Sequence, residues 1–339
     1  MKLKIIALFL FCYLISNSQN SKLTWKISPD ESITWNVQKS QPHSDHIEMS
    51  GFNISAIVTY GVDEKGKLVN RKKLVFPMLR TIPNDTHASL TKSFEGTEQP
   101  GFIVDGTLVE EFPQSFNLKG ILSVKSSTNT GLVISRSIFP SIDKAALVEI
   151  ITLQNPSAKP RNVKIQFTPT SITTPADKGV YGEYSVEVNA KIPDEITLIP
   201  GAEITFGLIY SGRKATEQPY NFSPVYELSK RKKFVDEIFE NLVLVTPNDT
   251  INKAFAFAKI RATESIYDTK GGLMHGPGGG AYYAAIWAND QAEYVNPFFP
   301  FLGNLAGNES AINSYRHFAR FMNHKYKPIP SSIIAEGVD

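Results

Sequence analysis

The residues best suited to chemistry lie in the stretch 278–300, where a glycine-rich loop, aromatic side chains and two carboxylates follow one another. The aromatic residues include Tyr283 and Trp287, and the carboxylates are Asp290 and Glu293. If Asp290 lies in the first turn of a helix, the peptide N–H groups and the helix dipole favour its charged form, which accepts hydrogen bonds from sugar hydroxyls. Trp287 would supply an apolar face beside it. A capping acid next to a core tryptophan is the structural alternative.

A second pair of carboxylates lies at the end of the sequence, where residues 327–339 read KPIPSSIIAEGVD. A proline-rigid loop there would deliver Glu336 and Asp339 to the same end of a helical barrel as Asp290. Two carboxylates that face one cleft from separate loops suit glycosidic bond hydrolysis, one as the acid and one to activate water. A solvent-exposed chain terminus is the structural alternative.

Other catalytic and ligand-binding patterns are missing from the sequence or lack their context. The glycine-rich run His275–Gly280 matches neither phosphate-binding pattern, so it favours close backbone packing or the rim of a pocket. His43 and His46 lie three apart in a predicted β region and would point to opposite faces, which argues against a metal site. The sequence contains no Gly-x-Ser-x-Gly element. We therefore expect no metal and no cofactor.

Two kinds of element must position these residues. From about residue 20 to residue 212, short β-branched runs are separated by turn signals at intervals of about 8 to 12 residues, which predicts an all-β domain. This region is longer than an immunoglobulin-type sandwich, so a large two-sheet antiparallel sandwich is expected. Within it, Pro200-Gly201 suits a type II turn between two strands, because glycine accepts a positive φ.

The pattern then changes to helical periodicity. Residues 213–245 are interpreted as a linker with one helix, which begins at Ser223-Pro224 and carries the run Lys230–Lys233 on a solvated face. Residues 246–339 are interpreted as the start of a helical barrel. Its first helix has Thr246 as N-cap and Pro247 at the first helical position, and packs on one side through Ile251, Ala254, Phe255, Ala258, Ala262 and Ile266.

Two further helices are expected in the barrel region. One runs from about Asp290 to Gly303. The other runs from about Glu309 to Met322, and the periodicity predicts a buried stripe of Ile312, Tyr315, Phe318, Ala319 and Met322.

The first residues, 1–18, are interpreted as a secretory signal peptide. Two lysines precede an apolar run from Ile5 to Ile15, and small residues follow it. The run is shorter than the about 20 residues that span a bilayer, so a retained membrane helix is the weaker alternative. We expect a secreted or periplasmic protein with no stable membrane insertion after cleavage. The only cysteine, Cys12, lies in this run, so no disulfide is expected in the mature chain.

The charge balance excludes one class of partner. The chain has 35 basic and 33 acidic residues, and two of the lysines lie in the proposed signal peptide, so the mature chain is neutral. A neutral chain offers no electrostatic footprint for nucleic acid.

The predicted elements follow one another in a characteristic order: a large β sandwich, a linker helix, a helix that begins with T-P-N-D (Thr246–Asp249), and the sequence W-A-N-D-Q-A-E-Y (Trp287–Tyr294). This order resembles that of the six-hairpin, (α/α)6-barrel glycoside hydrolases. This clan includes glucoamylases, bacterial α-L-rhamnosidases and glycogen-debranching-type enzymes. Its W-x-x-D tryptophan and aspartate, similar to Trp287 and Asp290, bind sugar at the start of the second barrel helix in glucoamylase-like members. The rhamnosidase-type acidic cluster before the tryptophan is not evident in this sequence.

The resemblance implies an exported glycoside hydrolase with a carbohydrate substrate and no nucleotide cofactor, and most members of the clan invert the anomeric configuration. It implies Asp290 and Glu336 as catalytic residues, and substrate contacts from Tyr283, Trp287, Glu293 and Asp339. A six-hairpin barrel has twelve helices, whereas the residues after Thr246 suffice for three helices and a loop. We therefore expect a multidomain β + α chain, a large antiparallel β sandwich followed by the first helices of an (α/α)6 barrel, truncated and inactive by itself.

Two alternatives stay open. One is a glycoside phosphorylase of the same architecture, which needs a phosphate site that the sequence does not reveal. The other is a non-catalytic glycan-binding protein, in which Trp25, Trp35 and Phe52 would form a sugar-stacking platform. The sequence leaves the sugar, the linkage and the oligomeric state undetermined.

Overall fold

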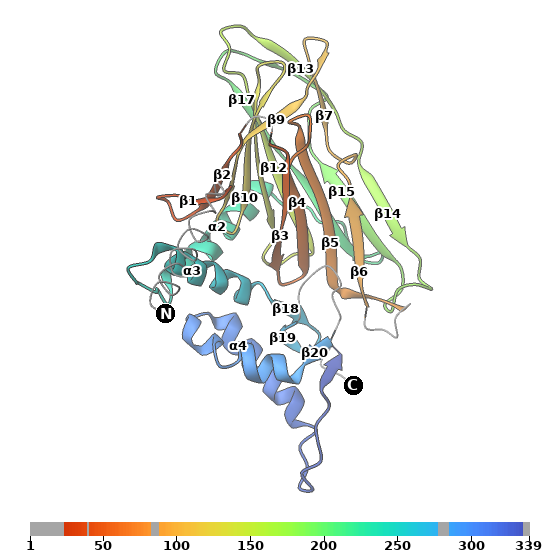
Figure 1. Cartoon of the computed structure of the whole chain (residues 1–339). Coiled ribbons are helices and arrows are strands. Elements are labelled where there is room, and N and C mark those ends of the chain that lie inside the picture. The colour runs from red at the N-terminus through yellow and green to blue at the C-terminus, as the bar shows by residue number, and fades with distance from the viewer. Residues whose placement is uncertain (1–23, 39–40, 83–87, 277–284, 335–339) are drawn as a thin grey trace, which may run out of the picture.

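The computed structural model describes residues 24–38, 41–82, 88–276 and 285–334. Figure 1 shows the long strands gathered in one part of the molecule, with α3, α4 and the C-terminal segment beneath them. This arrangement of antiparallel sheets followed by a few helices confirms the predicted fold class. The proposed signal peptide lies outside the described residues.

The largest sheet has nine strands, all paired antiparallel to their neighbours. In order across the sheet they are β1 (Lys26–Ile27), β2 (Ile33–Asn36), β9 (Glu111–Leu118), β10 (Leu122–Thr128), β11 (Val133–Pro140), β12 (Ala146–Gln154), β17 (Glu203–Lys214), β15 (Tyr184–Ala190) and β14 (Thr170–Thr174).

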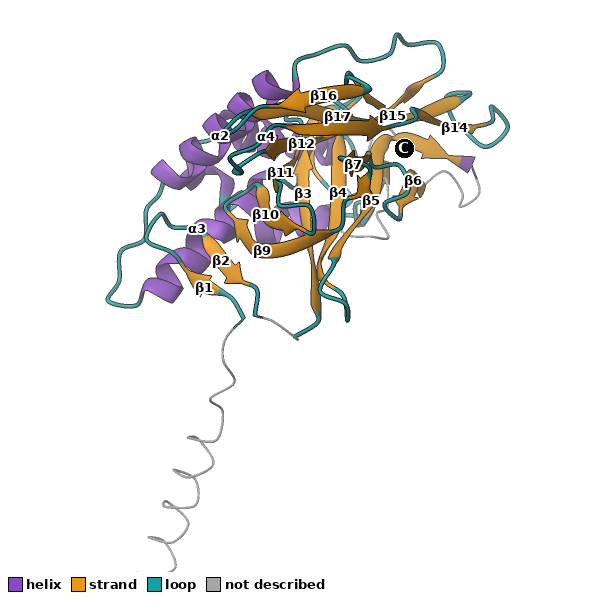
Figure 2. Ribbon diagram, turned by 90° about the horizontal axis from the view of Figure 1, so that it is seen from above, coloured by secondary structure: helices purple, strands orange, loops and turns teal. Residues whose placement is uncertain are grey.

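Two four-stranded sheets complete the β region. One is the meander β3 (His43–Gly51), β4 (Ile54–Val62), β5 (Leu68–Thr81) and β6 (Ala88–Phe94). The other has the order β16 (Glu195–Leu198), β13 (Arg161–Gln166), β7 (Gly101–Val104) and β8 (Thr107–Leu108). Figure 2, seen from above, shows the helices gathered along one side of the sheets.

The main core lies between these sheets and is built from inward-facing side chains of all three. At one end Trp35 stacks on Phe116 with ring centroids 4.7 Å apart, and Phe116 is fully buried. Burying a side chain of this size stabilises the fold by about 1.5–3 kcal/mol.

The predicted turn at Pro200-Gly201 is present, with Gly201 at φ 76° and a hydrogen bond from Ala202 N to Ile199 O of 3.0 Å. The strands that it joins do not pair with each other. β16 belongs to a four-stranded sheet and β17 to the nine-stranded sheet, so this turn carries the chain from one sheet to another.

A chain of buried charges crosses the sandwich. The Glu149 carboxylate lies 2.9 Å from Lys72 Nζ and 2.7 Å from Arg136 Nη1, and Arg136 Nη2 lies 2.7 Å from Glu111. Burial alone would raise the pKa of Glu149, but the two cations outweigh it and lower that pKa to about 2. Glu149 therefore stays charged at neutral pH although it is fully buried.

Helix α2 (Pro224–Glu240) follows the sandwich, with Ser223 as its N-cap and Pro224 at the first position. The expectation that Lys230–Lys233 forms a solvated face is wrong for Arg231, which is fully buried. Its guanidinium donates to Gly120 O at 2.9 Å and to Ser50 O at 3.0 Å, and pairs with Glu264. Arg231 therefore connects α2 to strand β3, to the turn between β9 and β10, and to the end of α3.

Helix α3 (Asp249–Thr263) begins two residues later than the sequence predicts. Thr246 does not cap it, because the Thr246 side chain bonds Asn252 Oδ1 at 2.8 Å. Asn248 is the cap and accepts from the backbone N–H groups of Thr250 and Ile251. The predicted packing face is also partly wrong, since Ile251 is half exposed and the buried residues are Lys259, Ile260 and Thr263.

Helix α4 (Leu305–Ala319) starts and ends earlier than predicted and buries a different face. Its buried residues are mostly small: Gly307, Ser310, Ala311, Ser314 and Phe318. A Cβ at Gly307 would lie 3.3 Å from the Phe299 side chain, so small residues allow the helix to approach its neighbours closely. The expected stripe residues Ile312, Tyr315 and Met322 are exposed instead.

The single helix expected from Asp290 to Gly303 is also wrong. The chain forms a π-helix, η2 (Asp290–Val295), and then a short 3-10 helix, η3 (Phe299–Leu302), which ends at Gly303 in the left-handed conformation. Pro297 and Pro300 cannot donate backbone hydrogen bonds, which accounts for the interruption.

Candidate functional site

A short hairpin and a two-stranded antiparallel ladder carry the segments that the sequence analysis selected. Strand β18 (Ile266–Thr269) pairs with β19 (Gly272–His275), and β20 (Ala285–Trp287) pairs with β21 (Ser332–Ile334). In the second ladder Trp287 lies opposite Ser332, and Ala288 N donates to Ser331 O at 2.8 Å. The structure thus joins the Trp287 segment to the C-terminal segment.

The second ladder is held by one apolar cluster beneath it. Ile286 and Ile333 are buried with Val75, Met274 and Phe318. Because successive strand residues point to opposite faces, Trp287 points away from this cluster and is 37% exposed. Trp287 is therefore not a core tryptophan, and its ring is available to a ligand.

Asp290 and Glu293 occupy the first turn of η2, directly after Trp287. Asn296 N donates to Gln291 O at 2.9 Å, which is the i to i+5 bond of a π-helix. Such π turns occur frequently at functional sites. Asp290 is partly buried and Glu293 is exposed.

The expectation that the helix start favours the charged form of Asp290 is wrong. Burial raises the pKa of Asp290 above its usual range, and the Glu293 carboxylate raises it further. The cap residue of η2, Asn289, makes no side-chain capping bond. The Asp290 carboxyl is therefore adapted to hold a proton more readily than an ordinary aspartate.

The sequence analysis missed a polar layer around η2. Gln291 donates through Nε2 to His275 O at 2.9 Å, and Asn296 donates through Nδ2 to Ser314 Oγ at 3.0 Å. Within the described part of the chain, Gln291 Oε1, Asn296 Oδ1 and Ser310 Oγ are buried without a hydrogen-bond partner. Gln291 inside W-A-N-D-Q-A-E-Y and Asn296 two residues after it were the available signal, but their burial could not be predicted without knowledge of the π-helix.

His275 and Ser265 form a close pair that could resemble a base and a nucleophile. His275 Nδ1 lies 2.6 Å from Ser265 Oγ, and this hydroxyl donates to Ala262 O at 2.6 Å. The serine therefore accepts from the histidine rather than donating to it. Burial also lowers the pKa of His275 to about 4, so the pair is a structural contact.

Three predicted site residues, Tyr283, Glu336 and Asp339, lie outside the described residues. The last described residue before Glu336 is Ile334, whose partner in the ladder is Ala285.

The aromatic platform of the glycan-binding alternative is not present. Trp35 is 4% exposed, and Trp25 packs against it edge to face with ring centroids 6.0 Å apart. Phe52 packs on the cluster of Ile266, Val295 and Phe299. These three side chains serve the packing of the fold.

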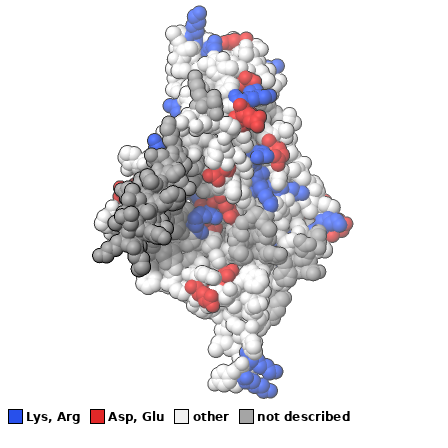
Figure 3. Space-filling model, viewed as in Figure 1, with Lys and Arg blue, Asp and Glu red and all other residues white. Residues whose placement is uncertain are grey.

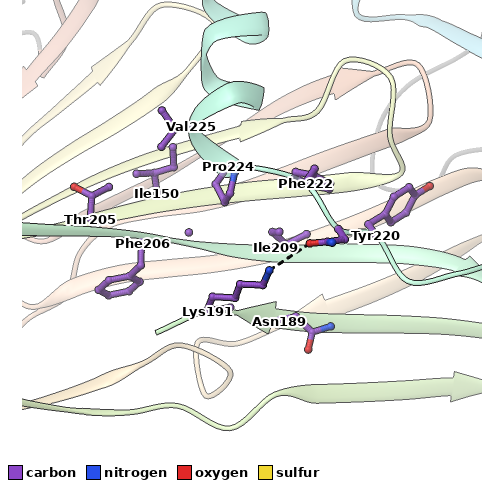
Figure 4. A pocket seen from close by; sticks show the side chains of 13 residues that line it. Ile150, Asn189, Lys191, Thr205, Phe206, Ile209, Tyr220, Phe222, Pro224 and Val225 are labelled. Carbon is purple, nitrogen blue, oxygen red and sulfur yellow. Dashed lines mark hydrogen bonds between the residues drawn. The ribbon is translucent and has the colours of Figure 1, made fainter. Parts of the chain in front are cut away.

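A cavity of about 420 Å³ lies on the outer face of the nine-stranded sheet, where α2 begins. Figure 4 shows its apolar wall of Ile150, Ile209, Phe222, Pro224 and Val225. Its polar side chains are already paired: Lys191 donates to Asn221 at 3.4 Å, and Thr205 shares a 2.8 Å hydrogen bond with Thr152.

Within the described ranges, no group of three or more His, Cys, Asp and Glu residues could hold a metal ion. None of the described helices is long and apolar enough to cross a membrane. On the face that Figure 3 shows, Lys and Arg are interspersed with Asp and Glu.

Comparison with solved structures identifies the fold. A candidate kojibiose phosphorylase from the human microbiome aligns with 94% of this chain and 53% of its own length, at 12% identity and a TM-score of 0.56. This chain has the same fold and spans about half the length of that protein. A bacterial glucoamylase solved with acarbose aligns with 91% of this chain and 56% of its own, at 11% identity and a TM-score of 0.38. No family model and no curated protein matches the sequence.

Proposed function

We propose that this chain is the N-terminal part of an enzyme that acts on glycosidic bonds of oligo- or polysaccharides. The observation that carries the proposal is the fold that it shares with the candidate kojibiose phosphorylase. The exposed Trp287 and the carboxyl of Asp290 at the β20–η2 junction add a surface suited to a sugar ring.

In the proposed site, Trp287 provides an apolar ring face and Asp290 a carboxyl with a raised pKa. A carboxyl of this kind donates a proton or a hydrogen bond to a sugar oxygen more readily than an ordinary aspartate. We assign Glu336, two residues beyond β21, as the partner carboxylate that activates water. Tyr283, Glu293 and Asp339 would contact the substrate. The expected reaction is hydrolysis with inversion.

Phosphorolysis is the second candidate, because the candidate phosphorylase shares this fold. In that reaction phosphate replaces water as the nucleophile at the anomeric carbon, and the product is a sugar phosphate.

The test compares the activity of two polypeptides: the chain as given, and the longer product that is encoded when the reading frame is followed beyond codon 339. A panel of glycans is incubated with and without phosphate, and free sugar and sugar phosphate are quantified. We expect turnover by the longer product alone, and a loss of about 10²–10⁴-fold in kcat for Asp290→Asn. Lys232→Ala, an exposed position on α2, is the matched control. A folded longer product that cleaves no glycan would overturn the proposal.

We also propose that residues 1–18 direct export to the periplasm or the medium. N-terminal sequencing of the protein isolated from the producing cells tests this, and a mature chain that still begins at Met1 would contradict it.

A further inference from the structure

The cavity of about 420 Å³ beside the start of α2 has a floor built from three strands. β12, β17 and β15 are neighbours in the nine-stranded sheet, and their register places Ile150 opposite Gly207 and Ile209 opposite Asn189. A Cβ at position 207 would lie 2.5 Å from the ring of Pro224. The glycine therefore allows the start of α2 to lie against the sheet and to close one side of the cavity.

The lining of this cavity suits a small molecule with an apolar body. Figure 4 shows the apolar side chains that face it, which are Ile150, Ile209, Phe222, Pro224 and Val225. The volume falls within the range of about 300–1,000 Å³ that small-molecule sites occupy, and such sites combine apolar walls with a few polar groups. An apolar group that moves from water into this space gains free energy in proportion to the area that it buries.

Among the described residues that line the cavity, Lys191 alone carries a charge. Its Nζ donates to Asn221 Oδ1 at 3.4 Å, the contact that Figure 4 marks with a dashed line. Asn221 is a neutral amide, so this long hydrogen bond leaves the ammonium charge uncompensated. Lys191 is exposed at the cavity rather than enclosed by packing, so an oxygen of a bound ligand can approach it.

The start of α2 is a second source of positive potential at the cavity. Pro224 and Val225 are the first two residues of this helix, and both line the cavity. The dipole of a helix favours negative charge near its first turn. Glu227, the acidic residue of that turn, is buried and accepts from Ser141 Oγ at 2.6 Å and Lys144 Nζ at 2.9 Å. Because this carboxylate has its own cation, the helix end still favours an anion.

We propose that this cavity binds a small organic anion that joins an apolar body, either an aliphatic chain or an aromatic ring, to a carboxylate. The apolar body lies on Ile150, Ile209 and Phe222, and the carboxylate accepts from Lys191 Nζ. A sugar is a poorer match, because the Thr205 hydroxyl is already engaged with Thr152 at 2.8 Å. The inference goes beyond the proposed function, and its test needs no catalysis.

The test is isothermal titration of the full chain at pH 7 with hexanoate, phenylacetate, their neutral amides and glucose. We expect one or both carboxylates to bind about fivefold more tightly than the matching amide, as one partly exposed ion pair allows. The tighter of the two carboxylates identifies the body as aliphatic or aromatic. Equal binding of carboxylates and amides overturns the proposal, as does an absence of binding or tighter binding of glucose.

Two variants of α2 locate the binding at this cavity rather than at other exposed apolar side chains. Val225 and Tyr226 are similarly exposed in the first turn, where an added carboxylate favours the helix, so both Asp variants should fold. Val225 lines the cavity, and Val225→Asp should weaken carboxylate binding at least about fivefold through like-charge repulsion. Tyr226→Asp is the matched control and should bind as the parent does. Equal binding by the two variants overturns the assignment.

Lys191→Met separates a ligand contact from a structural role, because it keeps the apolar stem of the side chain and removes the charge. We expect the affinity for the carboxylates to fall to that for the amides, with the affinity for the amides and the thermal stability unchanged. Lys159→Met, at another exposed lysine, is the control and should change neither affinity. Unchanged carboxylate binding in Lys191→Met, or an equal loss for carboxylates and amides, overturns the role of Lys191.

Discussion

Residues 24–214 enclose one large apolar core, whereas residues 224–334 hold their apolar side chains in several small clusters. Of the twenty large apolar side chains that are exposed among the described residues, sixteen lie at or beyond Val225. The β region therefore buries most of its own large apolar side chains, whereas the helical region leaves many of its own exposed.

Arg231 is where the two regions depend on each other most, so its loss is expected to have the largest effect. Arg231→Ala leaves the buried Glu264 carboxylate with Arg261 alone and removes two hydrogen bonds to the sheets. Breaking a buried pair in this way costs about 3–5 kcal/mol. Urea denaturation measures the free energy of unfolding, and exposed Lys233→Ala on the same helix is the control. Equal stabilities of the two variants would contradict this account of the junction.

The two regions are expected to lose stability in different pH windows. His275 in the helical region has a folded pKa of about 4, below the ordinary 6.5, so the unfolded chain takes up this proton first and stability falls from about pH 6.5 to pH 4. The loss amounts to about 3 kcal/mol. Glu149 in the sandwich has a pKa of about 2, so its contribution, present above about pH 4.5, is lost as the pH falls towards 2.

The variant His275→Gln tests whether His275 accounts for the loss of stability between about pH 6.5 and pH 4. Free energies of unfolding at pH 7 and pH 5 should differ less in this variant than in the parent chain. Exposed His324→Gln is the control and should keep the parent's difference. If His275→Gln keeps the whole difference, another group carries the acid sensitivity of the helical region.

The exposed face of α4 should give the smallest change in stability. Tyr315→Ser alters a side chain that is 55% exposed, so the free energy of unfolding should change by less than about 0.5 kcal/mol. Self-association, measured by light scattering, should decrease because the apolar surface shrinks. Phe318→Ser on the buried face is the contrasting variant and should destabilise strongly. Strong destabilisation by Tyr315→Ser would show that this face is already packed.

The sequence predicted strands better than helix faces, and the reason is physical. Alternation over β4 or β17 reports burial directly, because large apolar residues fill the space between sheets. Helix α4 buries small residues such as Ser310 and Ala311, so periodicity of large side chains selected the wrong face. Arg231 lay in a charge run, and only its three partners from distant segments explain its burial.

The candidate site was predictable in its residue types but not in its geometry. Trp287 and Asp290 could be selected from their spacing, and the structure places both at the junction of β20 and η2. The raised pKa of Asp290 depends on burial and on the Glu293 charge, and the chain forms the π-helix η2 where an α-helix was expected. A helical template anticipates neither feature.

The contacts of Arg231 also bear on the order in which the chain folds. Its partners Ser50 and Gly120 lie 181 and 111 positions earlier in the sequence. Contacts between such distant positions form slowly, because long loops must close first. Strand β3 and the β9–β10 turn must be in place before the guanidinium can donate to both carbonyls, so we expect α2 to dock after them. During synthesis Ser50 and Gly120 leave the ribosome well before Arg231. The strands that carry the two carbonyls can therefore pair before the arginine side chain is available to them.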